Sequence, residues 1–160
     1  LKREIERQIG EINGAFTDVG WVPIHYIYRS LDREELIAYY RASEIALITP
    51  LKDGMNLVAK EYCASQTEGK GVLILSEFAG TASQFHEYAL LVNPYDIEGV
   101  ADAIHEACFM DPNEIRRRMR GLRRSVQRQN IYSWVNRFLR TGISEKLNDF
   151  PSMAFFVPRS

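Results

Sequence analysis

A short apolar run followed by a glycine-bearing turn and an amphipathic helix most constrains the fold of this chain. Residues 45–48 have the sequence IALI, which predicts a strand covered on both faces. Asn56 is placed to cap a helix that continues to about Gln66. The first backbone N–H groups of such a helix attract a phosphate-bearing ligand, and Gly54 permits close approach of the backbone. The segment therefore predicts an α/β fold with a ligand site at this turn.

Two carboxylates flank the predicted anion site. Asp53 lies in the turn, and Glu61 follows in the helix, with seven residues between them. A phosphate alone would be repelled by these carboxylates, so their natural partners are sugar hydroxyls. Asp53 also has a purely structural explanation, because Asp-Gly is a common turn dipeptide. Glu61 has one too, since many glutamates on a helix only face solvent.

The rest of the chain repeats the alternation of strands and helices. Strands are expected at residues 22–28, 44–48, 71–75 and 89–92, and helices at 1–12, 32–42, 56–66 and 83–87. Asn13 and Gly14 are expected to end the first of these helices. Strands that alternate with helices pair in parallel. The prediction is a Rossmann-like parallel sheet, carried by residues 1–95.

From residue 96 onward the pattern is helical. Helices are expected at 96–110, 112–128 and 131–142, so residues 96–149 form a helical C-terminal extension of the same domain. The middle helix carries seven arginines, but its apolar stripe indicates an amphipathic helix with a charged outer face rather than a nucleic-acid site. An apolar tail, residues 150–160, is expected to pack on this domain, a neighbouring chain or a missing domain.

Composition excludes several classes of protein. The net charge of −1 predicts no attraction to nucleic acid or to a membrane surface. No apolar run reaches the length of a membrane span, and only two cysteines, Cys63 and Cys108, are present. A cytoplasmic protein is therefore expected. The three histidines are scattered, so no metal site and no cofactor are predicted. The chain begins at Leu1 within an apolar helical series, which suggests a portion of a longer protein.

Four ordered blocks of sequence carry a family resemblance. They are residues 20–24 (GWVPI), 49–62 (TPLKDGMNLVAKEY), 71–80 (GVLILSEFAG) and 91–96 (LVNPYD). Together they closely resemble the donor-binding motif of the trehalose-6-phosphate synthase family. That family consists of retaining glucosyltransferases with two Rossmann-like domains, the GT-B fold. The resemblance implies that this chain is the C-terminal, donor-binding portion.

The resemblance also implies roles for individual residues. Asp53 is expected as the catalytic residue that, with the backbone of residues 54–56, holds the hydroxyls of the donor glucose. Leu57 and Val58 are expected to offer N–H groups to the diphosphate, and Glu61 to bind the ribose hydroxyls. The substrate-binding set is thus Asp53, Gly54, Met55, Asn56, Leu57, Val58 and Glu61. Residues 76–80 are expected as a wall of this site, because they follow a strand at the same edge of the sheet, with a simple connecting loop as the alternative.

In the resembling enzymes, glucose passes from a nucleotide donor such as UDP- or GDP-glucose to glucose 6-phosphate, and trehalose 6-phosphate forms. The Arg/Lys clamp for the diphosphate and the acceptor pocket are expected ahead of Leu1, the pocket mostly in a missing N-terminal domain. Glucosylglycerol-phosphate synthases and pseudo-glycosyltransferases share the donor motif and remain alternatives. A module without catalytic activity that binds a sugar nucleotide or mediates assembly is a third alternative, and a homo-oligomer is left open.

Overall fold

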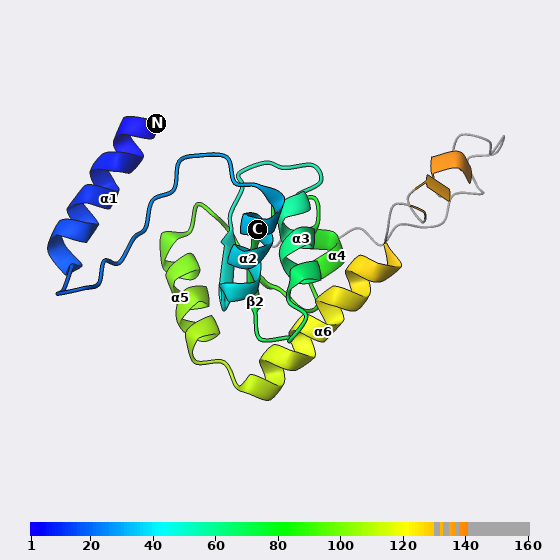
Figure 1. Cartoon of the computed structure of the whole chain (residues 1–160). Coiled ribbons are helices and arrows are strands. Elements are labelled where there is room, and N and C mark those ends of the chain that lie inside the picture. The colour runs from blue at the N-terminus through cyan, green and yellow to red at the C-terminus, as the bar shows by residue number, and fades with distance from the viewer. Residues whose placement is uncertain (130–131, 133–134, 137, 141–160) are drawn as a thin grey trace. The chain divides into compact units, whose positions relative to one another are not determined.

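The computed structural model describes residues 1–129, 132, 135–136 and 138–140 (Figure 1). The chain divides into two compact units, Leu1–Asp32 and Arg33–Ser160. Half of the residues of the helix predicted at 131–142 and all of the apolar tail at 150–160 lie outside the described residues. Within the described part, no helix is long and apolar enough to cross a membrane.

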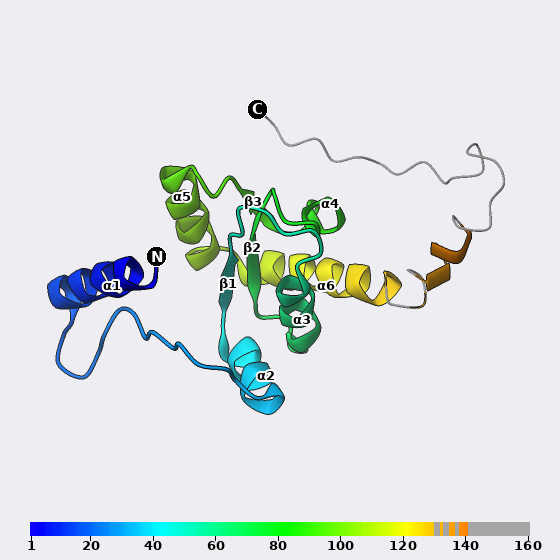
Figure 2. The same cartoon turned by 90° about the horizontal axis from the view of Figure 1, so that it is seen from above.

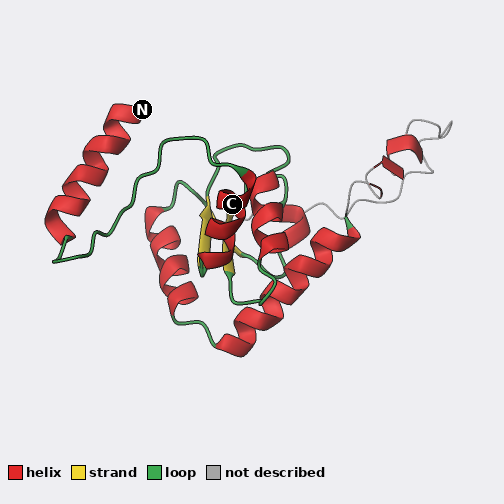
Figure 3. Cartoon of the chain, viewed as in Figure 1, coloured by secondary structure: helices red, strands yellow, loops and turns green. Residues whose placement is uncertain are grey.

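The second unit confirms the predicted alternation of helices and strands. Its elements are α2 (Arg33–Ala42), β1 (Ile45–Ile48), α3 (Leu57–Ser65), β2 (Val72–Ser76), α4 (Ala82–Phe85), β3 (Leu90–Val92), α5 (Ile97–Cys108) and α6 (Pro112–Arg128). The strands form a three-stranded parallel sheet in the order β1-β2-β3 (Figure 3). The predicted α/β fold with a parallel, Rossmann-like sheet is therefore confirmed.

Two hydrophobic clusters hold helices to the two faces of the sheet. Every residue of the central strand β2 is buried, and its side chains alternate between the faces. Leu73 and Leu75 pack with α3, α4 and α6, whereas Val72 and Ile74 pack with α5. Figure 2 shows the sheet between α5 on one side and α3 and α4 on the other. The sheet is thus the middle layer of a three-layer unit, and the loops at its ends carry the candidate sites.

The strand at residues 45–48 is less covered than its sequence predicted. β1 lies at the edge of the three-stranded sheet, and Leu47 is 45% exposed. A continuous apolar run predicts burial on both faces because such runs are typical of central strands. In this sheet the central strand is β2, and β1 is an edge strand.

The first unit departs from the sequence prediction in two places. Helix α1 (Lys2–Phe16) continues past Asn13 and Gly14, where a helix end was expected. Residues 22–28 form no strand, and the bridge found nearby within the described part of the chain is an isolated antiparallel one between Asp18 and Trp21. The Asn13 side chain joins the two segments at Ile24. Its side-chain NH2 group donates to the Ile24 carbonyl at 2.9 Å, and its side-chain oxygen accepts from the Ile24 N–H at 3.0 Å. A helix residue thus satisfies the two backbone groups of Ile24 that could otherwise pair with a neighbouring strand.

Candidate functional site

The turn at Asp53 lies beyond the C-terminal end of β1, where it meets the loop that follows β2. Asp53 and Ala79 form a parallel bridge, and the Gly80 N–H donates to the Asp53 carbonyl at 2.6 Å. Residues 76–80 are therefore held directly against the turn. The tertiary structure thus brings together two segments that the sequence assigned separately to this edge of the sheet.

The Asp53 side chain organises the interior of the turn. Its Oδ1 accepts hydrogen bonds from the N–H groups of Met55 at 3.0 Å and Asn56 at 2.9 Å. Its Oδ2 accepts from the Asn56 side-chain amide at 2.9 Å. These bonds, first that from Met55 and then those from Asn56, hold the pKa of the Asp53 carboxyl below its usual value. Asp53 is therefore an ionised acceptor, with lone pairs to spare for a further donor such as a hydroxyl.

Asn56 caps α3 as the sequence predicted. Its Oδ1 accepts from the Ala59 N–H at 3.0 Å, and its backbone adopts the left-handed conformation with φ of 52°. The Asn56 N–H is already bound to Asp53. Of the four N–H groups that begin a helix, those of Leu57 and Val58 form no hydrogen bond to any residue that the structure describes. Both residues are about half exposed, so this helix start can accept an anion.

The glycine that is sterically required at this turn is Gly80 rather than Gly54. Gly54 does not have a positive φ, and a Cβ atom there would meet open space. The left-handed conformation in this turn belongs to Asn56 instead. A Cβ atom on Gly80 would collide with the carbonyl group of Gly54. Sequence reasoning missed this role, since it depends on which loop lies opposite and not on the local pattern.

Glu61 lies in the second turn of α3 and is exposed. The Tyr40 hydroxyl, from α2, donates to its Oε2 at 3.3 Å. Burial, together with the nearby Glu61 charge, raises the pKa of Tyr40, so the hydroxyl stays protonated and keeps donating. The Tyr40 ring is itself held edge-on against Tyr62 at 6.3 Å between centroids. Tyr40 thus orients Glu61, a role that the sequence alone did not indicate.

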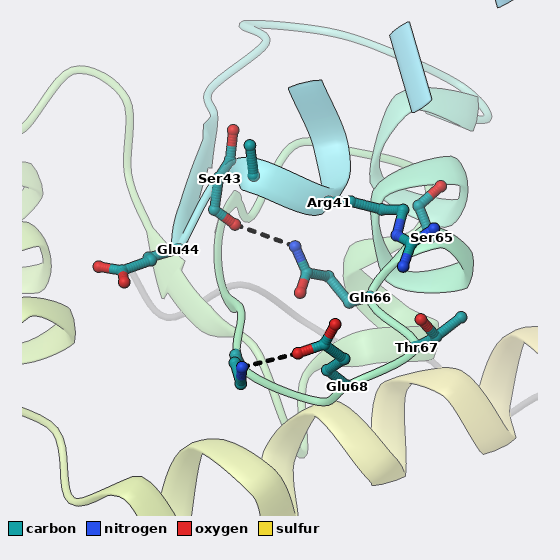
Figure 4. A pocket seen from close by; sticks show the side chains of 9 residues that line it. Arg41, Ser43, Glu44, Ser65, Gln66, Thr67 and Glu68 are labelled. Carbon is teal, nitrogen blue, oxygen red and sulfur yellow. Dashed lines mark hydrogen bonds and ion pairs between the residues drawn. The ribbon is translucent and has the colours of Figure 1, made fainter. Parts of the chain in front are cut away.

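The opposite end of the sheet carries a different hollow, shown in Figure 4. It has a volume of about 150 Å³ and surrounds the loop that leads from α3 to β2. The Gln66 side chain points to Ser43 and donates to its carbonyl at 2.9 Å, and Glu68 pairs with Lys70 at 2.6 Å (Figure 4). These polar groups bind one another and connect α2 to α3. We therefore interpret this hollow as part of the packing between the two helices and not as a ligand site.

The described residues also bear on a metal site and on the reactivity of Cys63. Among them, no group of three or more His, Cys, Asp or Glu side chains lies close enough to hold a metal ion. Cys63 is fully buried, and burial raises the pKa of its thiol to about 12. A thiol with that pKa is not a nucleophile near neutral pH.

Comparisons with known proteins give a consistent set of relatives. The model of glycosyltransferase family 20 matches residues 1–142. The trehalose-6-phosphate synthase of Mycobacterium sp. (strain KMS) is 50% identical over 139 residues, which cover 87% of this chain and 28% of that protein. The E. coli trehalose-6-phosphate structure bound with UDP-2-fluoro glucose superposes with a TM-score of 0.83 at 40% identity, covering 88% of this chain and 31% of that one.

A second solved structure is equally similar. The alpha,alpha-trehalose-phosphate synthase (UDP-forming) from Burkholderia xenovorans, in complex with glucose-6-phosphate, has a TM-score of 0.83 at 40% identity. The match covers 88% of this chain and 31% of that protein. These superpositions confirm the fold class expected from the resemblance, a Rossmann-like domain of a GT-B protein. The chain spans less than one third of the length of each of these relatives.

Proposed function

Since this chain belongs to glycosyltransferase family 20, we propose that it is the donor-binding portion of a retaining glucosyltransferase that forms trehalose 6-phosphate. Glucose would pass from a nucleotide sugar to glucose 6-phosphate. The observation that carries this proposal is the turn of residues 53–58, where an ionised carboxylate stands beside a helix start with two N–H groups that bond to none of the described residues. Such a pair of features suits a ligand that has both sugar hydroxyls and a diphosphate.

Each residue of the turn has a definite part in this proposal. Asp53 accepts a hydrogen bond from a hydroxyl of the donor glucose, which lies along the backbone of residues 54–56. Leu57 and Val58 donate their N–H groups to the diphosphate. Glu61, oriented by Tyr40, accepts from the ribose hydroxyls. UDP-glucose is the donor that we propose, because a similar structure holds UDP-2-fluoro glucose and another similar protein is described as UDP-forming.

The turn favours the transition state over the bound donor. Negative charge grows on the diphosphate as the bond to glucose breaks, so the N–H groups and the positive end of the α3 dipole bind it most strongly at that point. Asp53 is ionised and hydrogen-bonded by the turn, so it positions glucose but has no proton to donate. The leaving diphosphate is then the group on the same face that accepts the proton of the acceptor hydroxyl. We propose that the acceptor binds to residues beyond this chain.

Glu61→Gln in the full-length enzyme tests the donor proposal. The amide keeps the size of the side chain but is a poorer acceptor for ribose hydroxyls, so KM for UDP-glucose should rise about tenfold. The melting temperature should not change, because Glu61 is exposed. Glu106→Gln is the matched control, since Glu106 is an exposed glutamate on α5. A normal KM for UDP-glucose together with a lower melting temperature would show that Glu61 has only a structural role.

A further inference from the structure

A second hollow, which we call the arginine pocket, lies between α6 and the loop that leads from α3 to β2. It has a volume of about 370 Å³ and is lined by Arg116, Arg120, Arg123 and Arg124 of α6 together with residues 67–69 and Gln127. Glu68 is the one carboxylate in this lining, and its charge is already paired with Lys70 at 2.6 Å. The pocket therefore concentrates positive charge on a concave surface.

The spacing of these arginines places them on one face of α6. Arg120 lies four residues after Arg116, and Arg123 and Arg124 lie three and four residues after Arg120, so both of them neighbour Arg120 on the helix surface. Like charges at such spacings repel and destabilise a helix. The arginine pocket also includes a second segment of the chain, which Arg123 reaches by donating to the Gln66 carbonyl.

The hydrogen bonds of the pocket hold guanidinium groups without neutralising them. Arg116 donates to the Asn113 side-chain oxygen at 2.8 Å, and Arg123 donates to the Gln66 carbonyl at 3.0 Å. Both acceptors are uncharged. Two other arginines of α6, Arg117 and Arg118, pair with Glu114 at 2.7 Å. Within the part of the chain that the structure describes, none of the four pocket arginines forms an ion pair.

We propose that the arginine pocket binds a small anion that carries two or more phosphate groups. Guanidinium groups match phosphate oxygens in geometry and charge, and several phosphates are needed to engage several arginines. The pocket is separate from the Asp53 turn. Its loop, residues 67–69, precedes β2, whereas residues 76–80, which meet Asp53, follow β2. The five residues of β2 place these two ends roughly 15 Å apart.

Inorganic tripolyphosphate is the probe that tests the proposal, with binding to the full 160-residue chain measured by isothermal titration calorimetry at low salt. One binding site is expected. Arg120→Gln combined with Arg124→Gln should weaken binding about tenfold or more, because two charge-assisted contacts are lost. Arg3→Gln combined with Arg128→Gln removes the same charge outside the pocket and should change affinity about twofold at most. Tripolyphosphate should raise the melting temperature of the unmodified chain and of this control.

Several results would overturn the proposal. An equal loss of affinity for tripolyphosphate in the pocket variant and in its control would show that binding depends only on the net charge of the chain. Loss of binding in Leu57→Pro, which removes one N–H at the start of α3, with the pocket variant unaffected, would place the probe at the donor turn. Binding of a long polyanion such as heparin without any binding of tripolyphosphate would contradict a small ligand. The pocket variant should keep its melting temperature, because removal of like charges relieves repulsion in α6. None of these outcomes depends on the proposed donor function.

Discussion

At the Asp53 turn, the loop after β1 and the loop after β2 approach each other so closely that single side-chain atoms matter. Gly80 lies against the backbone of Gly54, and its N–H donates to the Asp53 carbonyl. Gly80→Ala should lower the stability of the protein by about 1–3 kcal/mol, because the new Cβ atom would force two backbone segments apart. Activity should fall as well, since the turn that we propose for the donor would move. Thermal unfolding and donor-dependent turnover, measured on one preparation, check both effects.

Gly54→Ala is the matched control for that substitution. Gly54 has no positive φ, and a Cβ atom there meets nothing within 4 Å. The variant should therefore unfold at nearly the temperature of the unmodified protein. If Gly54→Ala were the more destabilising of the two variants, the assignment of the close contact to Gly80 would be wrong.

Thr81 is a second residue whose environment leads to a prediction. It is 2% exposed, and its hydroxyl has no hydrogen-bond partner among the described residues. Although Thr81 precedes α4, its side chain makes no capping hydrogen bond. Thr81→Val replaces the unpaired hydroxyl with a methyl group of similar size, so it should stabilise the protein by about 1 kcal/mol. Urea unfolding measures the change, and a destabilised variant would reveal a partner for the hydroxyl that the structure does not show.

Helix α6 illustrates how charges act on a whole element. Asp111 caps it through the N–H groups of Asn113 and Glu114, and Pro112 occupies its first position. Glu114 then receives hydrogen bonds from Arg117 and Arg118, which lower its pKa to about 2. A lowered pKa in the folded state means stability that is fully present above about pH 4.5 and is lost as the pH falls toward 2.

Glu114→Gln should therefore destabilise the protein at pH 7 and much less at pH 2. At neutral pH the amide loses the charge that both arginines bind, whereas near pH 2 the carboxyl group is itself becoming protonated. Urea unfolding of both proteins across this range checks the result. Glu98→Gln controls for the loss of a carboxylate at a helix start, because Glu98 lies in the first turn of α5. If the two proteins differed equally in unfolding free energy at both pH values, the ion pairs of Glu114 would not be the cause of the difference.

At the scale of the whole molecule, the proposal that this chain binds the donor while other residues bind the acceptor leads to a prediction about activity. The chain covers 28–31% of the length of its relatives, and we propose that the acceptor binds elsewhere. The 160-residue chain alone should bind UDP-glucose but should not transfer glucose to glucose 6-phosphate. The rate of UDP release in the presence of glucose 6-phosphate measures glucose transfer, and the full-length enzyme gives the reference rate. Turnover by the chain alone would show that it contains both the acceptor site and the whole catalytic apparatus.

Local features of this protein could be predicted from its sequence because local interactions create them. The helix start at Asn56 is one example, since the cap and its Ala59 partner lie three residues apart. The buried strand β2 and the amphipathic helices α5 and α6 are others, because the period of apolar residues specifies them. The turn that contains Asp53 was located in the same way, from a strand, a glycine and a cap in sequence.

The tertiary structure alone decided features that join segments far apart in sequence. It paired Asp53 with Gly80, made Asn13 bind Ile24 where a strand was expected, and brought the arginines of α6 to the loop at residues 67–69. It also placed β1 at the edge of the sheet, although its sequence is that of a central strand. Sequence patterns report which face of an element is apolar, but which partner covers that face depends on the packing of the whole chain.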